Sequence, residues 1–190
     1  MTFSINLSRL SDEQLMKRAA DDNERAFAEL YNRYARRLQS FLYRQLDGDS
    51  ELAADYTHDT FLRLYDARHQ YHCQQSFQAW LFSIAYNLCK NRYRHLQVET
   101  KAMAAIDQQS EAEQPDVEVR LNREELANAL RSVLSSLPAE ARMLFALRFE
   151  EELTVAQTAA IMQLPEGTVK SRQHKIMNHI KQQLHDYETR

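Results

Sequence analysis

The chain has 190 residues, which is enough for one ordinary domain or two small ones. It contains only 2 Gly and 3 Pro but many helix-forming residues, so its composition predicts an almost entirely helical protein. The 2 cysteines exclude a disulfide framework, the first residues lack the basic and apolar parts of a signal peptide, and no stretch is apolar enough to span a membrane. We therefore expect the protein in the cytoplasm.

Charge is distributed unevenly along the chain. The formal net charge of −3 argues at first against nucleic acid as a partner. However, residues 87–95 hold three cations and no acid, and residues 165–184 hold four cations against Glu166 alone. Residues 97–120, which separate them, are rich in Asp and Glu. Two basic segments with an acidic connector predict a protein that meets DNA at two places.

Four helices are predicted in the first half of the chain. Ser11 and Gln14 have the spacing of a capping box, which opens the first helix. The predicted helices cover about residues 12–21, 24–46, 51–67 and 76–95. The apolar face of the second helix is expected to comprise Phe27, Leu30, Tyr31, Tyr34, Leu38, Phe41 and Leu42.

The second half begins with a change of composition. Residues 97–118 lose apolar periodicity, which predicts a flexible linker around Pro115. Helices are then predicted over about 119–134, from Pro138, over 154–162 and from 166 to about 187. The predicted fold class is all-α, with small helical domains at 1–96 and 119–190 joined by the linker.

The last two predicted helices have the layout of a helix-turn-helix, a short helix, the tight turn 163–165 and a longer basic helix. The apolar side of the long helix comprises Val169, Ile176, Met177, Ile180 and Leu184. The side predicted to meet DNA comprises Thr168, Lys170, Ser171, Arg172, His174, Lys175 and Asn178. The alternative is the solvated face of an ordinary bundle helix.

The third predicted helix has two contrasting faces. Ala53, Thr57, Phe61 and Leu64 are expected in the core. The opposite stripe comprises Asp55, Asp59, Leu62 and Asp66. An acidic stripe with one leucine suits a basic, partly apolar partner helix. The alternatives are a solvated face and, less well supported because no third ligand converges, a metal site.

The fourth predicted helix and the loop before it suit single-stranded nucleic acid. The expected core stripe is Phe77, Leu81, Ile84 and Leu88. Another side places Trp80 with Asn87, Lys90 and Arg94. An aromatic ring beside amides and cations holds a backbone and stacks an unpaired base, although plain core packing of Trp80 is the alternative. His69, His72 and Cys73 in the loop lack the spacing of a zinc site, so no metal is expected.

Four segments together resemble one protein family. They are AFAELYNRY at 26–34, ADYTHDTFL at 54–62, FQAWLFSIAYN at 77–87 and EGTVKSR at 166–172. The first three resemble the second conserved region of sigma factors and the last their fourth. Their order resembles the extracytoplasmic function (ECF) group. Two residues depart from the pattern, Gln163 at the usual turn glycine and Lys175 where arginine is commoner.

The resemblance implies a role for each segment. The stripe from Asp55 to Asp66 would bind core RNA polymerase, and the helix from 166 to about 187 would read the duplex −35 element. The single-stranded −10 element would meet the fourth helix and the loop residues Tyr71, His72 and Ser76. An anti-sigma factor is expected as a further partner, with no catalytic residue, cofactor or small-molecule substrate.

Two other functions are considered. A stand-alone helix-turn-helix regulator would bind specific duplex DNA without polymerase and needs none of the N-terminal motifs. A hydrolase using Asp55 and Asp59 would need a nucleophile and base, a phosphate-binding loop or a metal constellation, and the sequence has no convincing example of these. The sequence gives neither the promoter sequence nor the inducing signal.

Overall fold

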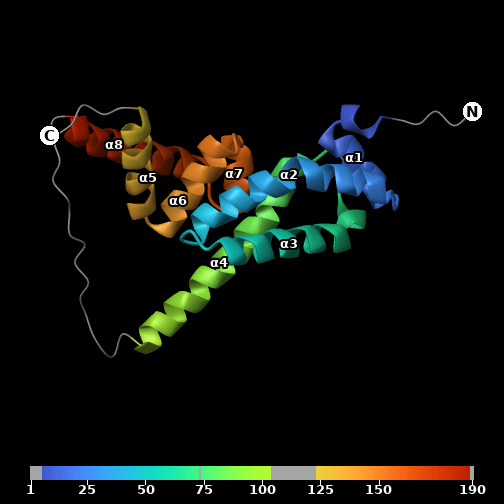
Figure 1. The fold of residues 1–190 in the computed structure, drawn as a ribbon, viewed down its shortest axis with the longest axis horizontal. Coiled ribbons are helices and arrows are strands. Elements are labelled where there is room, and N and C mark those ends of the chain that lie inside the picture. Colours follow the sequence, from blue (N-terminus) through green and yellow to red (C-terminus); the bar gives the residue numbers. More distant parts are fainter. Residues whose placement is uncertain (1–5, 73, 104–122, 189–190) are drawn as a thin grey trace, which may run out of the picture. The chain divides into compact units, whose positions relative to one another are not determined.

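The computed structural model describes residues 6–72, 74–103 and 123–188, and every element in these residues is a helix (Figure 1). The chain divides into two compact units, one made of residues up to 90 together with 160–163 and the other of the remaining residues after 90, so that α4 begins in the first unit and continues past its end. The predicted all-α fold class is confirmed. None of the described helices is long and apolar enough to cross a membrane.

The first unit contains the four predicted helices. They are α1 (Asp12–Ala20), α2 (Glu24–Gln45), α3 (Ser50–Asp66) and α4 (Phe77–Met103), with the short turns η1 (Leu7–Arg9) and η2 (Arg68–Gln70). Local capping chemistry sets where they begin. The Ser11 Oγ accepts from the Gln14 amide at 3.2 Å, and the Gln14 side chain accepts from the Ser11 amide at 3.0 Å, as the capping box predicts.

Aromatic contacts join the helices of the first unit. Phe41 on α2 meets Phe82 on α4 edge-to-face with ring centroids 5.1 Å apart, and Tyr34 meets Phe77 at 5.2 Å. Such pairs contribute about 0.5–1.5 kcal/mol each beyond the burial of their area. The core residues expected on α3 are all buried. Helix α2 is therefore packed against both α3 and α4.

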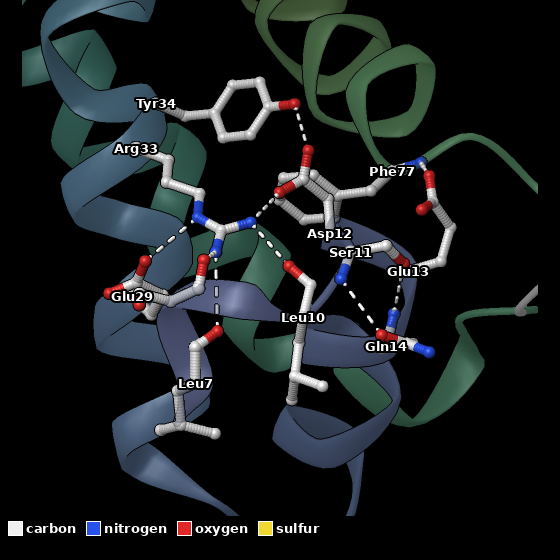
Figure 2. Close-up of polar contacts among 11 residues, drawn as sticks. Leu7, Leu10, Ser11, Asp12, Glu13, Gln14, Glu29, Arg33, Tyr34 and Phe77 are labelled. Atoms are coloured by element: carbon white, nitrogen blue, oxygen red, sulfur yellow. Dashed lines mark hydrogen bonds and ion pairs between the residues drawn. The ribbon is translucent and has the colours of Figure 1, made fainter. Parts of the chain in front are cut away.

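Arg33 fastens the start of the chain to α2 (Figure 2). Its Nη1 donates to the Asp12 carboxylate at 2.8 Å, and its Nε donates to Glu29 at 3.0 Å. The guanidinium also donates to the backbone carbonyl oxygens of Leu7, Ser8 and Leu10. The Tyr34 hydroxyl donates to the other Asp12 oxygen at 2.6 Å. These bonds order the segment before α1, which has no buried residue in η1.

Two expectations for the first unit are wrong. Ile84 was expected in the core stripe of α4 but is only half-buried. Helix α4 continues to Met103, beyond the predicted end near residue 95, so residues 97–103 of the expected linker are helical. No glycine or proline interrupts 96–103, which explains why the helix does not stop there. The rest of that linker lies outside the described residues.

The second unit contains the remaining helices. They are α5 (Arg123–Ser136), α6 (Ala139–Phe145), α7 (Val155–Met162) and α8 (Glu166–Glu188). The predicted start of α5 at 119 lies outside the described residues. Helix α8 packs against α5 and α6. The buried core of the second unit comprises Val133, Leu137, Met143, Leu144, Leu147, Leu153, Val169, Ile176 and Ile180.

A π-helical turn, η3 (Ala146–Glu150), follows α6 directly. The Glu151 amide donates to the Ala146 carbonyl at 2.9 Å, which is the five-residue spacing of a π turn. Ala146 and Leu147 are buried, whereas Phe149 is exposed and lies 5.0 Å from the ring of Phe145. The turn therefore keeps the apolar residues in the core while it ends the helix.

Candidate functional site

The turn between α7 and α8 lies where the sequence predicts the turn of a helix-turn-helix. Gln163 has a φ of 57°, in the left-handed region where glycine is favoured. The Leu164 amide donates to the Ala159 carbonyl at 3.0 Å and closes the end of α7. Pro165 precedes α8, and its carbonyl accepts from the Thr168 amide at 2.9 Å. The backbone thus follows a glycine-like path although the residue is glutamine.

Thr154 begins α7 through a reciprocal cap. The Thr154 Oγ1 accepts from the Gln157 amide at 3.2 Å, and the Gln157 Oε1 accepts from the Thr154 amide at 2.8 Å. The predicted cap is confirmed, and Gln157 adds the second half of a capping box. Both ends of the short helix are therefore fixed by local sequence.

Helix α8 presents the two faces predicted for a recognition helix. Val169, Ile176 and Ile180 are buried, while Met177 and Leu184 are half-buried. Thr168 and Arg172 are half-buried at the edge of the outer face. The exposed residues are Lys170, Ser171, His174, Lys175 and Asn178. The exposed face thus offers cations, hydroxyl and imidazole groups, which suit phosphates and base edges.

Local bonds order some of these side chains. The Arg172 Nη1 lies 2.9 Å from the Glu140 carboxylate on α6. The His174 Nε2 and Asn178 Nδ2 lie 2.9 Å apart, and the Ser171 hydroxyl donates to the Thr168 carbonyl at 3.1 Å. These bonds limit the rotamers of the outer face before any DNA is bound.

Arg148 supports α8 from the π turn, a role that the sequence did not indicate. Its Nε donates to the Gln173 Oε1 at 3.0 Å, and its Nη1 donates to the Leu153 carbonyl. One side chain thereby joins α8 to the segment that precedes α7. Gln173 is 25 residues from Arg148 in sequence, so helical spacing gives no indication of this contact.

The acidic stripe on α3 faces solvent in part. Asp55 and Asp66 are exposed, and Leu62 is 50% exposed. Asp59 is half-buried and already accepts from Arg63, whose Nε lies 3.2 Å from each of its carboxylate oxygens. The stripe therefore combines two exposed acids, one acid bound by Arg63 and an exposed apolar side chain.

Tyr31 adds an exposed aromatic ring to this part of the unit. Its ring centroid lies 4.7 Å from that of Phe61, the residue before Leu62. Phe27 also meets Phe61, at 6.2 Å, and meets Tyr65 at 5.0 Å. Helical spacing placed Tyr31 on the apolar face of α2 correctly, but spacing alone does not tell how far a neighbouring helix covers that face.

The loop before α4 is held to the helix by one aromatic contact. Tyr71 and Trp80 have ring centroids 5.2 Å apart, and the Tyr71 hydroxyl donates to the Gln75 carbonyl at 2.6 Å. His72 is exposed, and the Ser76 Oγ accepts from the Ala79 amide at 3.3 Å. Trp80 is half-buried, so it both packs and keeps part of its ring accessible. Cys73 lies outside the described residues.

Further along α4, the polar residues predicted to share a side with Trp80 differ in exposure. Asn87 and Arg94 are exposed, and Lys90 is half-buried with its amine 5.6 Å from the centroid of the Tyr86 ring. That distance is at the outer limit of a cation–π contact. No group of three or more His, Cys, Asp or Glu suited to a metal ion occurs among the described residues.

Comparison with known proteins decides the family. Sigma-70 region 2 matches residues 30–98, and Sigma-70, region 4 matches residues 133–182. The ECF RNA polymerase sigma-E factor of Escherichia coli (strain K12) is 30% identical over 173 residues, which cover 86% of this chain and 89% of that protein. The chain belongs to the ECF family of RNA polymerase sigma factors. This confirms the family that the four sequence segments resemble.

Other relatives agree with this membership. The ECF RNA polymerase sigma factor SigW of Bacillus subtilis (strain 168) is 27% identical to this sigma factor over 179 residues, covering 90% of this chain and 95% of SigW. The structure of CnrH in complex with the cytosolic domain of CnrY is 22% identical, covers 92% of this chain and 97% of CnrH, and has a TM-score of 0.66. This sigma factor therefore shares the helical fold of that structure and recognises promoters for RNA polymerase.

Proposed function

We propose that this sigma factor divides promoter recognition between its two halves, with core polymerase and the −10 element met by residues 1–96 and the −35 element by residues 119–190. The observation that carries this proposal is the position of the two family matches. Region 2 covers α3 and the described part of α4 up to residue 98, and region 4 covers α6 to α8. The acidic stripe lies in the first match and the basic face of α8 in the second. Residues 97–118 connect the halves.

For the −35 element, the exposed face of α8 enters the major groove of duplex DNA. Lys170 and Lys175 make no ion pair with the described residues, so both ammonium groups are available to phosphates or bases. Thr168 lies in the first turn of α8, where backbone amides favour a phosphate oxygen. Ser171, Arg172 and His174 complete the surface.

For the −10 element, an unpaired base of the non-template strand stacks beside the Tyr71–Trp80 pair. Half-burial fixes the Trp80 ring while part of it stays accessible. His72 and Ser76 lie in the same loop, and Asn87, Lys90 and Arg94 continue along α4 toward the strand backbone. The energy of stacking and phosphate contacts offsets the unstacking of the base, which costs a few kcal/mol.

For core polymerase, the docking surface is the stripe Asp55, Asp59, Leu62 and Asp66, with the exposed ring of Tyr31 as a further contact. Leu62 and Tyr31 supply apolar area, and Asp55 and Asp66 supply charge for a basic partner helix. A solved structure of the sigma factor RpoE with the anti-sigma factor NepR from Bartonella quintana is 22% identical and has a TM-score of 0.64. We propose an anti-sigma factor as a partner of this chain also.

The chain contributes binding and positioning, and polymerase catalyses RNA synthesis. This division predicts that the sigma factor itself has no catalytic residue and no cofactor, and that it works in the cytoplasm, where core polymerase is. Its net charge of −3 further supports weak DNA binding by the free chain, because phosphate contacts dominate affinity for duplex DNA.

The decisive experiment is in vitro transcription from a promoter library, with core polymerase in the presence and absence of the full chain. We expect new transcripts with shared −35 and −10 sequences only when the chain is present. Core polymerase that starts no new transcript in its presence overturns the proposal. Tight, specific binding of the free chain to promoter duplex at physiological salt favours a stand-alone regulator instead.

A further inference from the structure

We propose that Asp22, in the turn between α1 and α2, is a positioning residue that holds the loop of residues 68–76 ready for the −10 strand. This inference rests on the proposed function of that loop. Asp22 is 46 residues from Arg68 in sequence and lies outside the match to Sigma-70 region 2. It touches no proposed DNA contact itself, so its effect passes through Arg68.

The Arg68 side chain links three parts of the first unit. Its Nη2 donates to the Asp22 Oδ1 at 2.8 Å, and its Nε lies 3.3 Å from the same oxygen. Its Nη1 donates to the Tyr65 carbonyl at 2.9 Å, and its guanidinium carbon lies 4.1 Å from the centroid of the Tyr65 ring. These contacts from a side chain that is only 17% exposed fix the first residue of the loop.

The backbone at Asp22 is held in one conformation. Asp22 has a φ of 62°, a left-handed conformation that Asp tolerates better than most residues. Its amide donates to the Ala19 carbonyl at 3.1 Å, and the Asn23 amide donates to the Arg18 carbonyl at 3.0 Å. These bonds close the end of α1, so the Asp22 side chain projects from a rigid turn and not from a loose loop.

Two side chains of the loop lie near this carboxylate. Besides Arg68, the His69 Nε2 lies 3.9 Å from the Asp22 Oδ1. The hydrogen bonds from the Arg68 guanidinium hold the pKa of the Asp22 carboxyl below its ordinary value. Asp22 is therefore charged at physiological pH, and the contact is present under the conditions of transcription.

The far end of the loop is held as well. Tyr71 contacts Trp80 and donates to the Gln75 carbonyl, while His72 between these contacts is exposed. A loop held at both ends loses less conformational entropy when it captures a base, so its affinity is higher than that of a loose loop. Asp22 binds Arg68 and so holds the start of the loop, at the end away from α4.

The test measures strand capture by holoenzyme made with the full chain. The probe is the single-stranded oligonucleotide that wild-type holoenzyme selects from a library of random −10 sequences. Asp22→Gly removes the carboxylate but keeps the left-handed turn, and Arg68→Gln removes its partner. The matched control is Asp21→Ala, which removes the exposed neighbouring carboxylate that takes no part in these bonds.

We expect Asp22→Gly to weaken oligonucleotide binding by about threefold to tenfold, the cost of ordering a few loop side chains on binding. Discrimination against substitutions of the captured base should fall in parallel, while the affinities for core polymerase and for −35 duplex stay unchanged. The Asp22→Gly, Arg68→Gln double variant should be no worse than Arg68→Gln alone, because Arg68→Gln already removes the contact with Asp22.

Two results would overturn the inference. Wild-type affinity and base discrimination in Asp22→Gly, with only a lower melting temperature, show that the contact merely stabilises the fold and overturn the inference alone. Failure of wild-type holoenzyme to select any oligonucleotide overturns the proposed −10 surface, and the inference falls with it.

Discussion

The Arg172 guanidinium on α8 lies 2.9 Å from the Glu140 carboxylate on α6, so a cation proposed to meet the −35 element already has an acidic partner. Both side chains are exposed enough for water to screen the pair, and such pairs contribute about 0.2–1 kcal/mol to stability. If Arg172 meets DNA as proposed, a phosphate competes with Glu140 for the same guanidinium. The pair should then lower the affinity of α8 for DNA.

From this competition we predict that Glu140→Ala strengthens binding of the holoenzyme to −35 duplex, by about threefold at low salt, because one acid near the phosphates is lost and Arg172 is released. Arg172→Ala should weaken binding, and Glu140→Ala should strengthen it less in the Arg172→Ala background than in the wild type, because only the release of Arg172 is lost there. Fluorescence anisotropy with labelled duplex measures these affinities. Weaker binding by Glu140→Ala contradicts the prediction and shows that Glu140 orients Arg172 toward DNA.

Lys175 provides a separate test of the α8 surface. Lys175→Ala should lower affinity for −35 duplex and reduce the slope of log affinity against log salt by about 1 if the ammonium contacts phosphate. Lys175→Arg should keep that slope and shift base preference toward guanine, since the guanidinium fork matches two acceptors of that base. Binding to core polymerase should be unchanged in both.

Lys181→Ala is the matched control for Lys175, because Lys181 is also exposed on α8 but lies nearly two turns further along. An equal loss of affinity in both variants would indicate a general charge effect and would remove Lys175 from the proposed contact surface.

Much of this architecture follows from local sequence signals. The caps at Ser11 and Thr154 and the apolar side of α8 need only neighbours within a turn or two, and all are confirmed. The left-handed turn residue Gln163 could be placed by resemblance, because the glycine usual there indicates the backbone conformation. These features are decided by short-range geometry and capping chemistry, which a single sequence displays.

Other features depend on packing that the sequence does not display. Helical spacing predicts Tyr31 on the apolar face of α2, but its exposure depends on how α3 lies against that face. The contacts Arg148–Gln173 and Asp22–Arg68 join residues 25 and 46 positions apart. Such pairs form only when the tertiary fold brings two surfaces together, so they could not be read from periodicity.

The acidic stripe predicts unequal roles for its aspartates. Asp55 is exposed, whereas the Asp59 carboxylate already accepts from Arg63. We expect Asp55→Ala to weaken core-polymerase binding by about threefold to tenfold at low salt and less at high salt, and Asp59→Ala to weaken it less. The double variant should be weakest. Competition with labelled wild-type chain for core polymerase measures these affinities.

Glu24→Ala is the control for the stripe, because Glu24 is an exposed acid in the first turn of α2 and is not on α3. Its affinity for core polymerase should equal that of the wild type. If Glu24→Ala and Asp55→Ala lose affinity equally, total charge and not the stripe governs docking.

Tyr34 predicts how stability responds to alkaline pH. Burial of its ring, with the hydrogen bond to the Asp12 carboxylate, raises the pKa of the Tyr34 phenol above its ordinary value. A raised folded-state pKa stabilises the fold at pH values below the unfolded-state pKa, which is about 10 for tyrosine, and this stabilisation is lost as pH rises beyond it. The free energy of unfolding should therefore fall above about pH 10.

Tyr34→Phe isolates this contribution, because it keeps the ring against Phe77 and removes only the titrating hydroxyl. At neutral pH the variant should be less stable by about 1 kcal/mol, the usual value of one hydrogen bond. The difference should shrink as pH rises above 10, by at most about 1.4 kcal/mol per pH unit, since only the wild type must keep that phenol protonated.

Urea unfolding across this pH range measures the difference in stability between wild type and Tyr34→Phe, with Tyr43→Phe, at an exposed tyrosine, as the control. Parallel pH profiles for wild type and Tyr34→Phe would show that the Tyr34–Asp12 bond does not couple folding to protonation, because no other consequence of removing the hydroxyl depends on pH in this way.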